Sequence, residues 1–223
     1  MGRVGNIWFC GYRDWALDIF EAVSTMNEVP IRLLKTEDEF DNAISSFSKE
    51  DLLLFVGWSW IISKNITDRM RCVCLHPSPL PKYRGGSPIQ HQIINGEEES
   101  AVTLFLMNKY IDKGPILFSK NISLAGSLNS IFLRIIKYGK VGLNKVINQY
   151  INEVPLLGQE QQESEKSYYS RRTPEMSEIT IDDFRCKSSE ELYNKIRALA
   201  DPYPNAYFVC VDGKKLFIKE SSL

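Results

Sequence analysis

The sequence predicts an α/β protein with a doubly wound, mostly parallel sheet and a small carboxyl-terminal appendage of helix and β-hairpin. Three observations lead to this prediction. Short apolar segments alternate with segments of helical periodicity along most of the chain. The apolar segments are continuous, as is typical of strands covered on both faces. A two-residue turn signal flanked by apolar runs then follows the last amphipathic segment.

The opening segment predicts a strand, a helix and a second strand. Residues 4–10 form an apolar run that Gly11 ends. Apolar residues recur at helical spacing from Trp15 to Val23, which predicts a helix. Residues 30–34 predict the second strand. Ligands of doubly wound sheets bind beyond the carboxyl ends of the strands, so we expect a site in the loops that follow them.

A capped helix and a buried strand come next. Thr36 is followed three residues later by Glu39, a capping-box pattern that predicts a helix reaching about Phe47. Residues 51–56 are apolar at nearly every position and predict a third strand, which Gly57 ends.

The middle of the chain supplies the remaining elements of the core. Residues 71–76 predict a fourth strand that enters a loop rich in proline, and 87–95 predict a short helix. Residues 101–107 and 114–123 predict two partner strands, and the apolar stripe over 127–150 predicts the longest helix.

The carboxyl-terminal part predicts a separate small unit. Residues 158–167 are rich in Gln and Glu and predict a polar linker between a core of 1–157 and a subdomain of 168–223. Within that subdomain Ser188 and Glu191 form a second capping-box pattern.

The end of the chain predicts a hairpin. Asp212-Gly213 lies between the strand-like segments 206–211 and 215–219. The hairpin has a free edge, on which we expect a second copy of the chain to be able to pair as a homodimer. Arg171 and Arg172 open the appendage and are expected to be a solvated pair.

Composition and charge exclude several classes of function. The chain has 223 residues, 27 Lys and Arg against 28 Asp and Glu, and a formal net charge of −1. This balance argues against a protein that coats nucleic acid or an anionic membrane. No run of 18 apolar residues is present, and residues 1–6 lack the apolar run of a signal peptide. We expect a cytoplasmic protein with no nucleic-acid or membrane partner.

The segment 72–86 carries the strongest chemical signal. Cys72, Cys74 and His76 alternate along one predicted strand and therefore point to the same face. Two thiols and an imidazole suit zinc as ligand types, but ligands spread along one strand cannot close tightly on one ion. The chain has only two histidines and no CxxC pattern, so we predict no metal. His76, at the carboxyl end of the strand, is a candidate for either a catalytic or a structural role.

The segment 102–117 carries the second signal. Asp112 lies two residues before Gly114, in the loop between two predicted strands. The simplest interpretation is a turn residue. The alternative is a carboxylate that reaches His76, where it would orient the imidazole and tune its proton affinity.

Taken together, these segments resemble the folate-dependent formyltransferases, which move a formyl group from N10-formyltetrahydrofolate to an amine. The resemblance is dense over about residues 50–125 and implies a Rossmann-like core. The motifs that carry it are His76-Pro77-Ser78, Leu80-Pro81, Arg84-Gly85, Pro88-Ile89-Gln90, Gly96-Glu97, Val102-Thr103 and Asp112-x-Gly114.

Within this family the sequence is most similar to the enzymes that formylate nucleotide-linked amino sugars for bacterial surface glycans. The segment 11–15 is not the Gly/Ser-rich phosphate loop of the glycinamide ribonucleotide enzymes. Residues 168–223 are too few for the full basic domain of the initiator-tRNA enzymes. The segments 11–17, 57–62, 197–199 and 202–207 resemble parts of the sugar enzymes.

The resemblance assigns roles to individual residues. His76 and Asp112 correspond to the catalytic histidine and aspartate, and Cys74 stands where the family has a catalytic asparagine. The residues implied to bind the folate co-substrate are Trp58, Ser59, Trp60, Ile61, Ile62, Tyr110, Ile111 and Gly114. The residues implied to bind the acceptor are Ser78, Lys82, Tyr83, Arg84 and Gly85.

Cys74 departs from the family pattern. A thiol is a weak hydrogen-bond donor and cannot replace a carboxamide N–H. Four interpretations stay open: Asn108 or Ser78 supplies the donor, the enzyme is slow, the protein binds its ligands without catalysing, or the thiolate acts as a nucleophile beside His76. The third makes the chain a catalytically impaired folate- or sugar-nucleotide-binding homologue.

Overall fold

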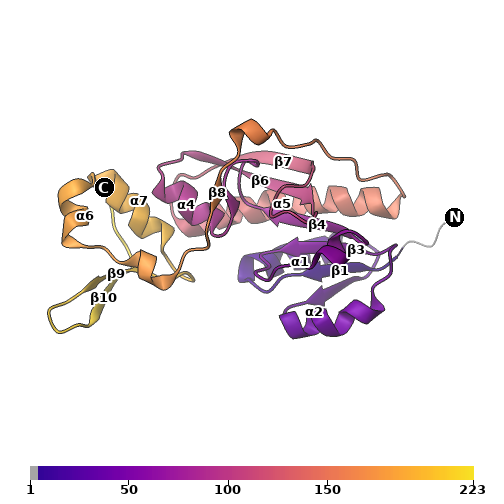
Figure 1. Ribbon diagram of the computed structural model, residues 1–223, viewed down its shortest axis with the longest axis horizontal. Coiled ribbons are helices and arrows are strands. Elements are labelled where there is room, and N and C mark those ends of the chain that lie inside the picture. The colour runs from indigo at the N-terminus through magenta and orange to yellow at the C-terminus, as the bar shows by residue number, and fades with distance from the viewer. Residues whose placement is uncertain (1–4) are drawn as a thin grey trace.

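A computed structural model describes residues 5–223, and its centre is a six-stranded sheet in the order β2-β1-β3-β4-β6-β7 (Figure 1). Residues 1–4 lie outside the described part, so the predicted start of the first strand at Val4 is not described. The strands of this sheet are β1 (Ile7–Cys10), β2 (Ile31–Leu34), β3 (Leu52–Val56), β4 (Arg71–His76), β6 (Glu99–Leu106) and β7 (Ile116–Ser123).

The sheet is parallel except at one side, which confirms the predicted mixed α/β class. Strands β2, β1, β3 and β4 run parallel, whereas β6 and β7 are antiparallel to their neighbours. Every residue of β1 and of β3 is buried, which explains their continuous apolar character. The register places Cys74 of β4 between Phe55 of β3 and Phe105 of β6.

Helices cover both faces of the sheet. Helices α1 (Asp14–Met26) and α5 (Leu128–Ile151) lie side by side on one face, with Ile19, Val23 and Ile131 in the main apolar cluster. Helix α2 (Glu37–Ala43) covers the other face, where Phe40 packs in a second cluster. Because side chains alternate along β1, β3 and β4, these strands contribute to both layers.

The first capping box is only half formed. The Thr36 hydroxyl accepts from the backbone N–H of Glu39 at 3.1 Å, but the Glu39 carboxylate accepts from Lys35 rather than from Thr36. Helix α2 ends at Ala43 and continues as one 3-10 turn, Ile44–Ser46. The predicted second box, between Ser188 and Glu191, is complete.

Several shorter elements connect and extend the core. They are α3 (Lys64–Thr67), α4 (Pro88–Ile94), α6 (Ile181–Cys186), α7 (Ser189–Ala198), the 3-10 turns Glu163–Glu165 and Pro174–Ser177, and the paired strands β5 (Arg84–Gly85) and β8 (Tyr168–Tyr169). Among residues 5–223, every helix is too short or too polar to cross a membrane.

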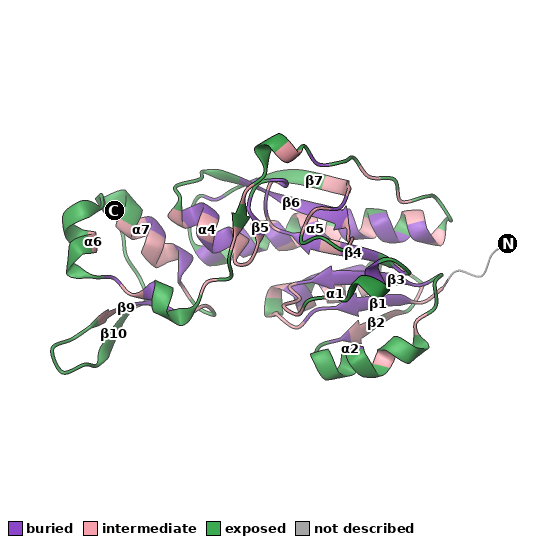
Figure 2. Cartoon of the chain, in the orientation of Figure 1, coloured by how far each residue is buried: buried purple, intermediate pink, exposed green. Residues whose placement is uncertain are grey.

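The predicted hairpin is present as β9 (Ala206–Val209) and β10 (Lys215–Ile218). It packs through Ala206 onto Ile179 and Leu199, a small core of its own. The outward part of the hairpin is exposed (Figure 2), and Leu216 and Phe217 are more than half exposed. Pairing of this edge with a second copy of the chain stays a prediction.

The polar segment 158–167 is fastened to the core. Gln161 is buried, and its Nε2 donates to the carbonyls of Asp112 and Gly114 at 3.0 and 2.7 Å. Its Oε1 accepts from Nε and Nη2 of Arg84 at 3.0 and 2.6 Å. Arg84 is wholly buried, and its hydrogen bond lowers the pKa of Glu163 to about 2. The division into domains at this segment stays a prediction.

We expect Gln161→Ala to lower the free energy of unfolding by about 2–3 kcal/mol, because two N–H groups of the buried Arg84 guanidinium lose their acceptor. The neighbouring exposed Gln162 offers a matched control, and Gln162→Ala should change the free energy by less than about 0.5 kcal/mol. Urea unfolding measures both. Equal effects of the two substitutions would show that the segment is a loose linker.

Candidate active site

His76 is the last residue of β4, and a hydrogen bond to the backbone fixes its ring. The Nε2–H donates to the carbonyl oxygen of Tyr83 at 2.8 Å, which directs Nδ1 toward Asp112. Nδ1 lies 3.6 Å from Oδ2 of Asp112. His76 is 6% exposed and borders the cavity described below.

Asp112 is both a turn residue and the partner of His76. Its backbone has a φ of +50°, in the left-handed region that a non-glycine residue adopts only at a cost. Its carboxylate accepts from the backbone N–H of Gly85 at 2.7 Å, and its carbonyl accepts from Gln161. These contacts orient the carboxylate toward His76.

Gly114 explains why the loop after Asp112 turns so sharply. A Cβ at this position would lie 1.6 Å from the carbonyl oxygen of Leu106, so no other residue fits. The carbonyl of Gly114 accepts from Gln161 and faces the interior. Gly114 therefore shapes the loop from outside the cavity.

A cavity of about 530 Å³ opens beside His76, Cys74 and Asp112. It lies beyond the carboxyl ends of β3 and β4, where ligands of such sheets bind. Its wall includes most of the residues for which the resemblance implies folate binding: Trp58, Ser59, Trp60, Ile61, Ile62, Tyr110 and Ile111. The structure thus brings these residues, from three separate segments, to one cavity.

Cys74 faces this cavity as a neutral thiol. Burial raises its pKa well above the usual value, and the nearby Asp112 carboxylate and Cys72 raise it further. A thiol that stays protonated is a poor nucleophile. Within residues 5–223, no group of three His, Cys, Asp or Glu side chains is arranged to hold a metal ion.

Four of the five residues to which the resemblance assigns the acceptor lie outside the cavity wall. The Ser78 hydroxyl is buried and donates to the carbonyl of Lys82, whose own side chain is exposed. The Tyr83 hydroxyl donates to the Glu97 carboxylate. The Arg84 side chain is buried and donates to Gln161 and Glu163. Gly85 does line the cavity.

The cavity also contains residues to which the resemblance assigns no role. Among them are Arg13, Trp15, Gln90, Arg171 and Tyr203. Arg171 reaches the cavity because β8 pairs with β5, which lays the chain after Tyr169 against Gly86. Pairing between two-residue strands so far apart in the sequence leaves no periodic signal from which to predict it.

Comparison with known proteins places this geometry in a family. Residues 21–132 match the family model described as formyl transferase, and 173–223 match that of the formyl transferase C-terminal domain. The methionyl-tRNA formyltransferase of Orientia tsutsugamushi is 34% identical over 179 residues, covering 78% of this chain and 55% of its own length. That of Finegoldia magna is 32% identical over 166 residues, covering 73% and 52%. The chain thus spans about half the length of the curated relatives it matches.

Solved structures agree on the fold. A methionyl-tRNA formyltransferase from Clostridium thermocellum superposes with a TM-score of 0.82 at 29% identity, covering 98% of this chain and 93% of that one. A sugar N-formyltransferase from a Shewanella species superposes with a TM-score of 0.77 at 18% identity, covering 99% of both chains. The second likeness concerns the fold alone. From the family-model matches, together with the fold and the motifs around His76 and Asp112, we conclude that the chain belongs to the formyl transferase family.

Proposed function

We propose that the protein transfers a formyl group from N10-formyltetrahydrofolate to an amine of its acceptor. The observation that carries this proposal is the His76–Asp112 pair, 3.6 Å apart at the wall of a cavity of about 530 Å³. Formyl transfer needs a group that takes a proton from the attacking amine and donors for the developing oxyanion. A fixed imidazole beside a carboxylate suits the first requirement.

The proposed step conserves atoms and charge. The neutral amine attacks the formyl carbon, a new C–N bond forms, and the bond between that carbon and N10 of the folate breaks. The His76–Asp112 pair accepts the proton that the amine loses and returns it to N10. Because Tyr83 holds Nε2 and Gly85 holds the carboxylate, neither group needs to reorganise during the transfer.

The aromatic end of the cavity suits the folate. Trp58 and Trp60 pack edge to face with ring centroids 4.7 Å apart. Ile61, Tyr110 and Ile111 line the cavity and are 87%, 53% and 57% exposed. Large apolar side chains left open at a cavity favour a flat, partly apolar ligand such as a pterin.

For the acceptor we propose a nucleotide-linked amino sugar, of the kind used in bacterial surface glycans. The carboxyl-terminal unit 168–223 has nine Lys and Arg against nine Asp and Glu, which gives it no basic surplus for RNA. A second candidate is methionyl-tRNA. It is favoured by the 34% identity to the Orientia tsutsugamushi protein and by the match to the C-terminal domain model.

Incubation with N10-formyltetrahydrofolate and two sets of acceptors tests the proposal. One set contains nucleotide-linked amino sugars, and the other contains charged initiator tRNA. We expect a formylated amino sugar by mass spectrometry and no formyl-methionyl-tRNA. Formylation of the tRNA alone would replace the proposed acceptor. No product from either set, with folate binding demonstrated, would favour the catalytically impaired homologue.

We propose Asn108 as the donor that compensates for Cys74. Asn108 lines the same cavity, and its Oδ1 accepts from the backbone N–H of Tyr110 at 2.9 Å. This bond orients the amide group and leaves its NH₂ for another partner. Ser78, the other candidate, already donates its hydroxyl hydrogen to the carbonyl of Lys82.

We therefore expect Asn108→Ala to lower kcat about 10²- to 10³-fold, the usual loss for one oxyanion donor, with little change in folate affinity. Cys74→Ala serves as the matched control and should lower kcat less than tenfold. Single-turnover kinetics measure both. If Cys74→Asn creates turnover in a protein that otherwise has none, the impaired-homologue interpretation is correct instead.

A further inference from the structure

Among residues 5–223, two arginines at the edge of the cavity have no acidic partner. Within residues 5–223 the arginines that form ion pairs are Arg84 and Arg185. The guanidinium of Arg13 instead lies over the rings of Tyr12 and Tyr203, 5.2 and 5.6 Å from their centroids. Arg171 donates from Nη2 to the Ser59 hydroxyl at 3.2 Å. Their charges therefore remain available to an anion.

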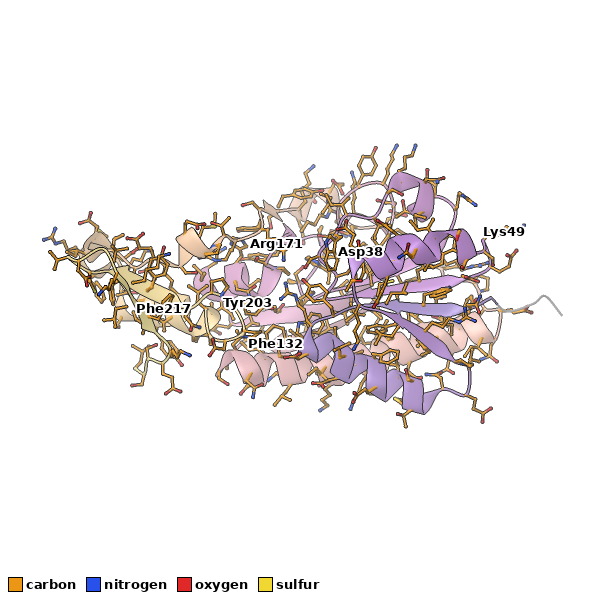
Figure 3. All side chains as sticks on the ribbon, turned by 90° about the horizontal axis from the view of Figure 1, so that it is seen from below. Asp38, Lys49, Phe132, Arg171, Tyr203 and Phe217 are labelled. Atoms are coloured by element: carbon orange, nitrogen blue, oxygen red, sulfur yellow. The ribbon has the colours of Figure 1, made fainter. Side chains whose placement is uncertain are left out.

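The two guanidinium groups belong to one site although they are far apart in sequence. The Tyr12 hydroxyl and the Ser59 hydroxyl lie 2.6 Å apart, so a short chain of contacts joins Arg13 to Arg171. Figure 3 shows Arg171 and Tyr203 at the junction between the sheet and the carboxyl-terminal unit. Both arginines line the cavity that His76 borders.

Buried donors lie in the same wall. The Trp15 Nε1–H and the Gln90 Nε2 are buried without a close acceptor, although both lie near enough to the Tyr203 hydroxyl to oppose the rise that burial causes in its pKa. Gln90 is only 4% exposed, and both side chains border the cavity. A buried donor without an acceptor is costly, which favours a ligand that brings oxygen atoms. Two cations and two neutral donors together suit an oxyanion.

The inference rests on the proposed function, because it concerns the acceptor of that reaction. We propose that Arg13 and Arg171 bind a phosphate group of the acceptor, while Trp15 and Gln90 donate to its neighbouring oxygens. Guanidinium groups bind phosphate oxygens with charge-assisted, two-pronged hydrogen bonds. The diphosphate of a nucleotide sugar and the phosphodiesters of an RNA 3′ end share this chemistry. The site differs from the one that the resemblance places at Lys82, Tyr83 and Arg84.

Calorimetric titration of the full chain tests the site with three probes: inorganic pyrophosphate, thymidine diphosphate and a short single-stranded RNA. We expect Arg13→Ala and Arg171→Ala each to weaken binding about tenfold or more, and added salt to weaken binding to the unaltered protein. Arg171→Lys should bind with intermediate affinity, because lysine keeps the positive charge but cannot form the bidentate hydrogen bonds of a guanidinium group. Preference for the nucleotide or for the RNA identifies the source of the phosphate.

Arg185→Ala is the matched control. Arg185 is exposed on α6 of the carboxyl-terminal unit, pairs with Asp182 and should not affect binding of any probe. Equal affinity of Arg13→Ala, Arg171→Ala and the unaltered protein would overturn the inference, as would absence of binding by the unaltered protein.

Titration with N10-formyltetrahydrofolate separates this inference from the proposed function. Folate binding that is the same in all variants, with phosphate binding lost in Arg13→Ala and Arg171→Ala, supports both. Phosphate binding that is lost in Arg13→Ala and Arg171→Ala, with no folate binding by any variant or by the unaltered protein, would support the phosphate site and contradict the proposed function. Folate binding together with unaltered phosphate binding in both variants would support the proposed function and contradict the phosphate site.

Discussion

The imidazole of His76 is fixed by its hydrogen bond to the Tyr83 carbonyl, with the Asp112 carboxylate 3.6 Å from its other nitrogen, and the site is organised around this pair. The Tyr83 carbonyl fixes Nε2, and the Asp112 carboxylate faces Nδ1. Asp112 is itself held by the Gly85 N–H and, through its carbonyl, by Gln161. The left-handed backbone at Asp112 persists because these contacts outweigh its cost.

The same contacts connect the site to the polar segment after α5. Gln161 binds the Arg84 guanidinium on one side and the loop of Asp112 on the other. Arg84, in the segment that follows His76, and Gln161, in the polar segment, therefore share one hydrogen-bond network. Removing one member of such a buried network destabilises the fold, because the remaining polar groups lose their hydrogen-bond partners. The pairing of β5 with β8 extends this connection and brings Arg171 to the cavity.

Much of the core could be predicted from the sequence, and the parts that could not have a physical reason. Continuous apolar runs predict β1 and β3 because both strands are buried on two faces. The composition of 158–167 indicated a linker, yet Gln161 is buried, because its amide satisfies groups that only the folded chain brings near it. The resemblance assigns Arg84 to the acceptor by its position in a motif, whereas the buried Arg84 binds Gln161 and Glu163 far along the chain. Local patterns do not report such distant partners.

If His76 and Asp112 act as one unit on the transferred group, as we propose, the effects of substituting them are not independent, and double-mutant kinetics measure this. Single-turnover formyl transfer is measured for His76→Gln, Asp112→Asn and the double variant, alongside calorimetric affinity for N10-formyltetrahydrofolate. We expect losses of about 10²- to 10⁴-fold for each single variant, no further loss in the double variant, and folate affinity within a few-fold of the unaltered protein. Losses that multiply in the double variant, or transfer that survives the single substitutions, would contradict it.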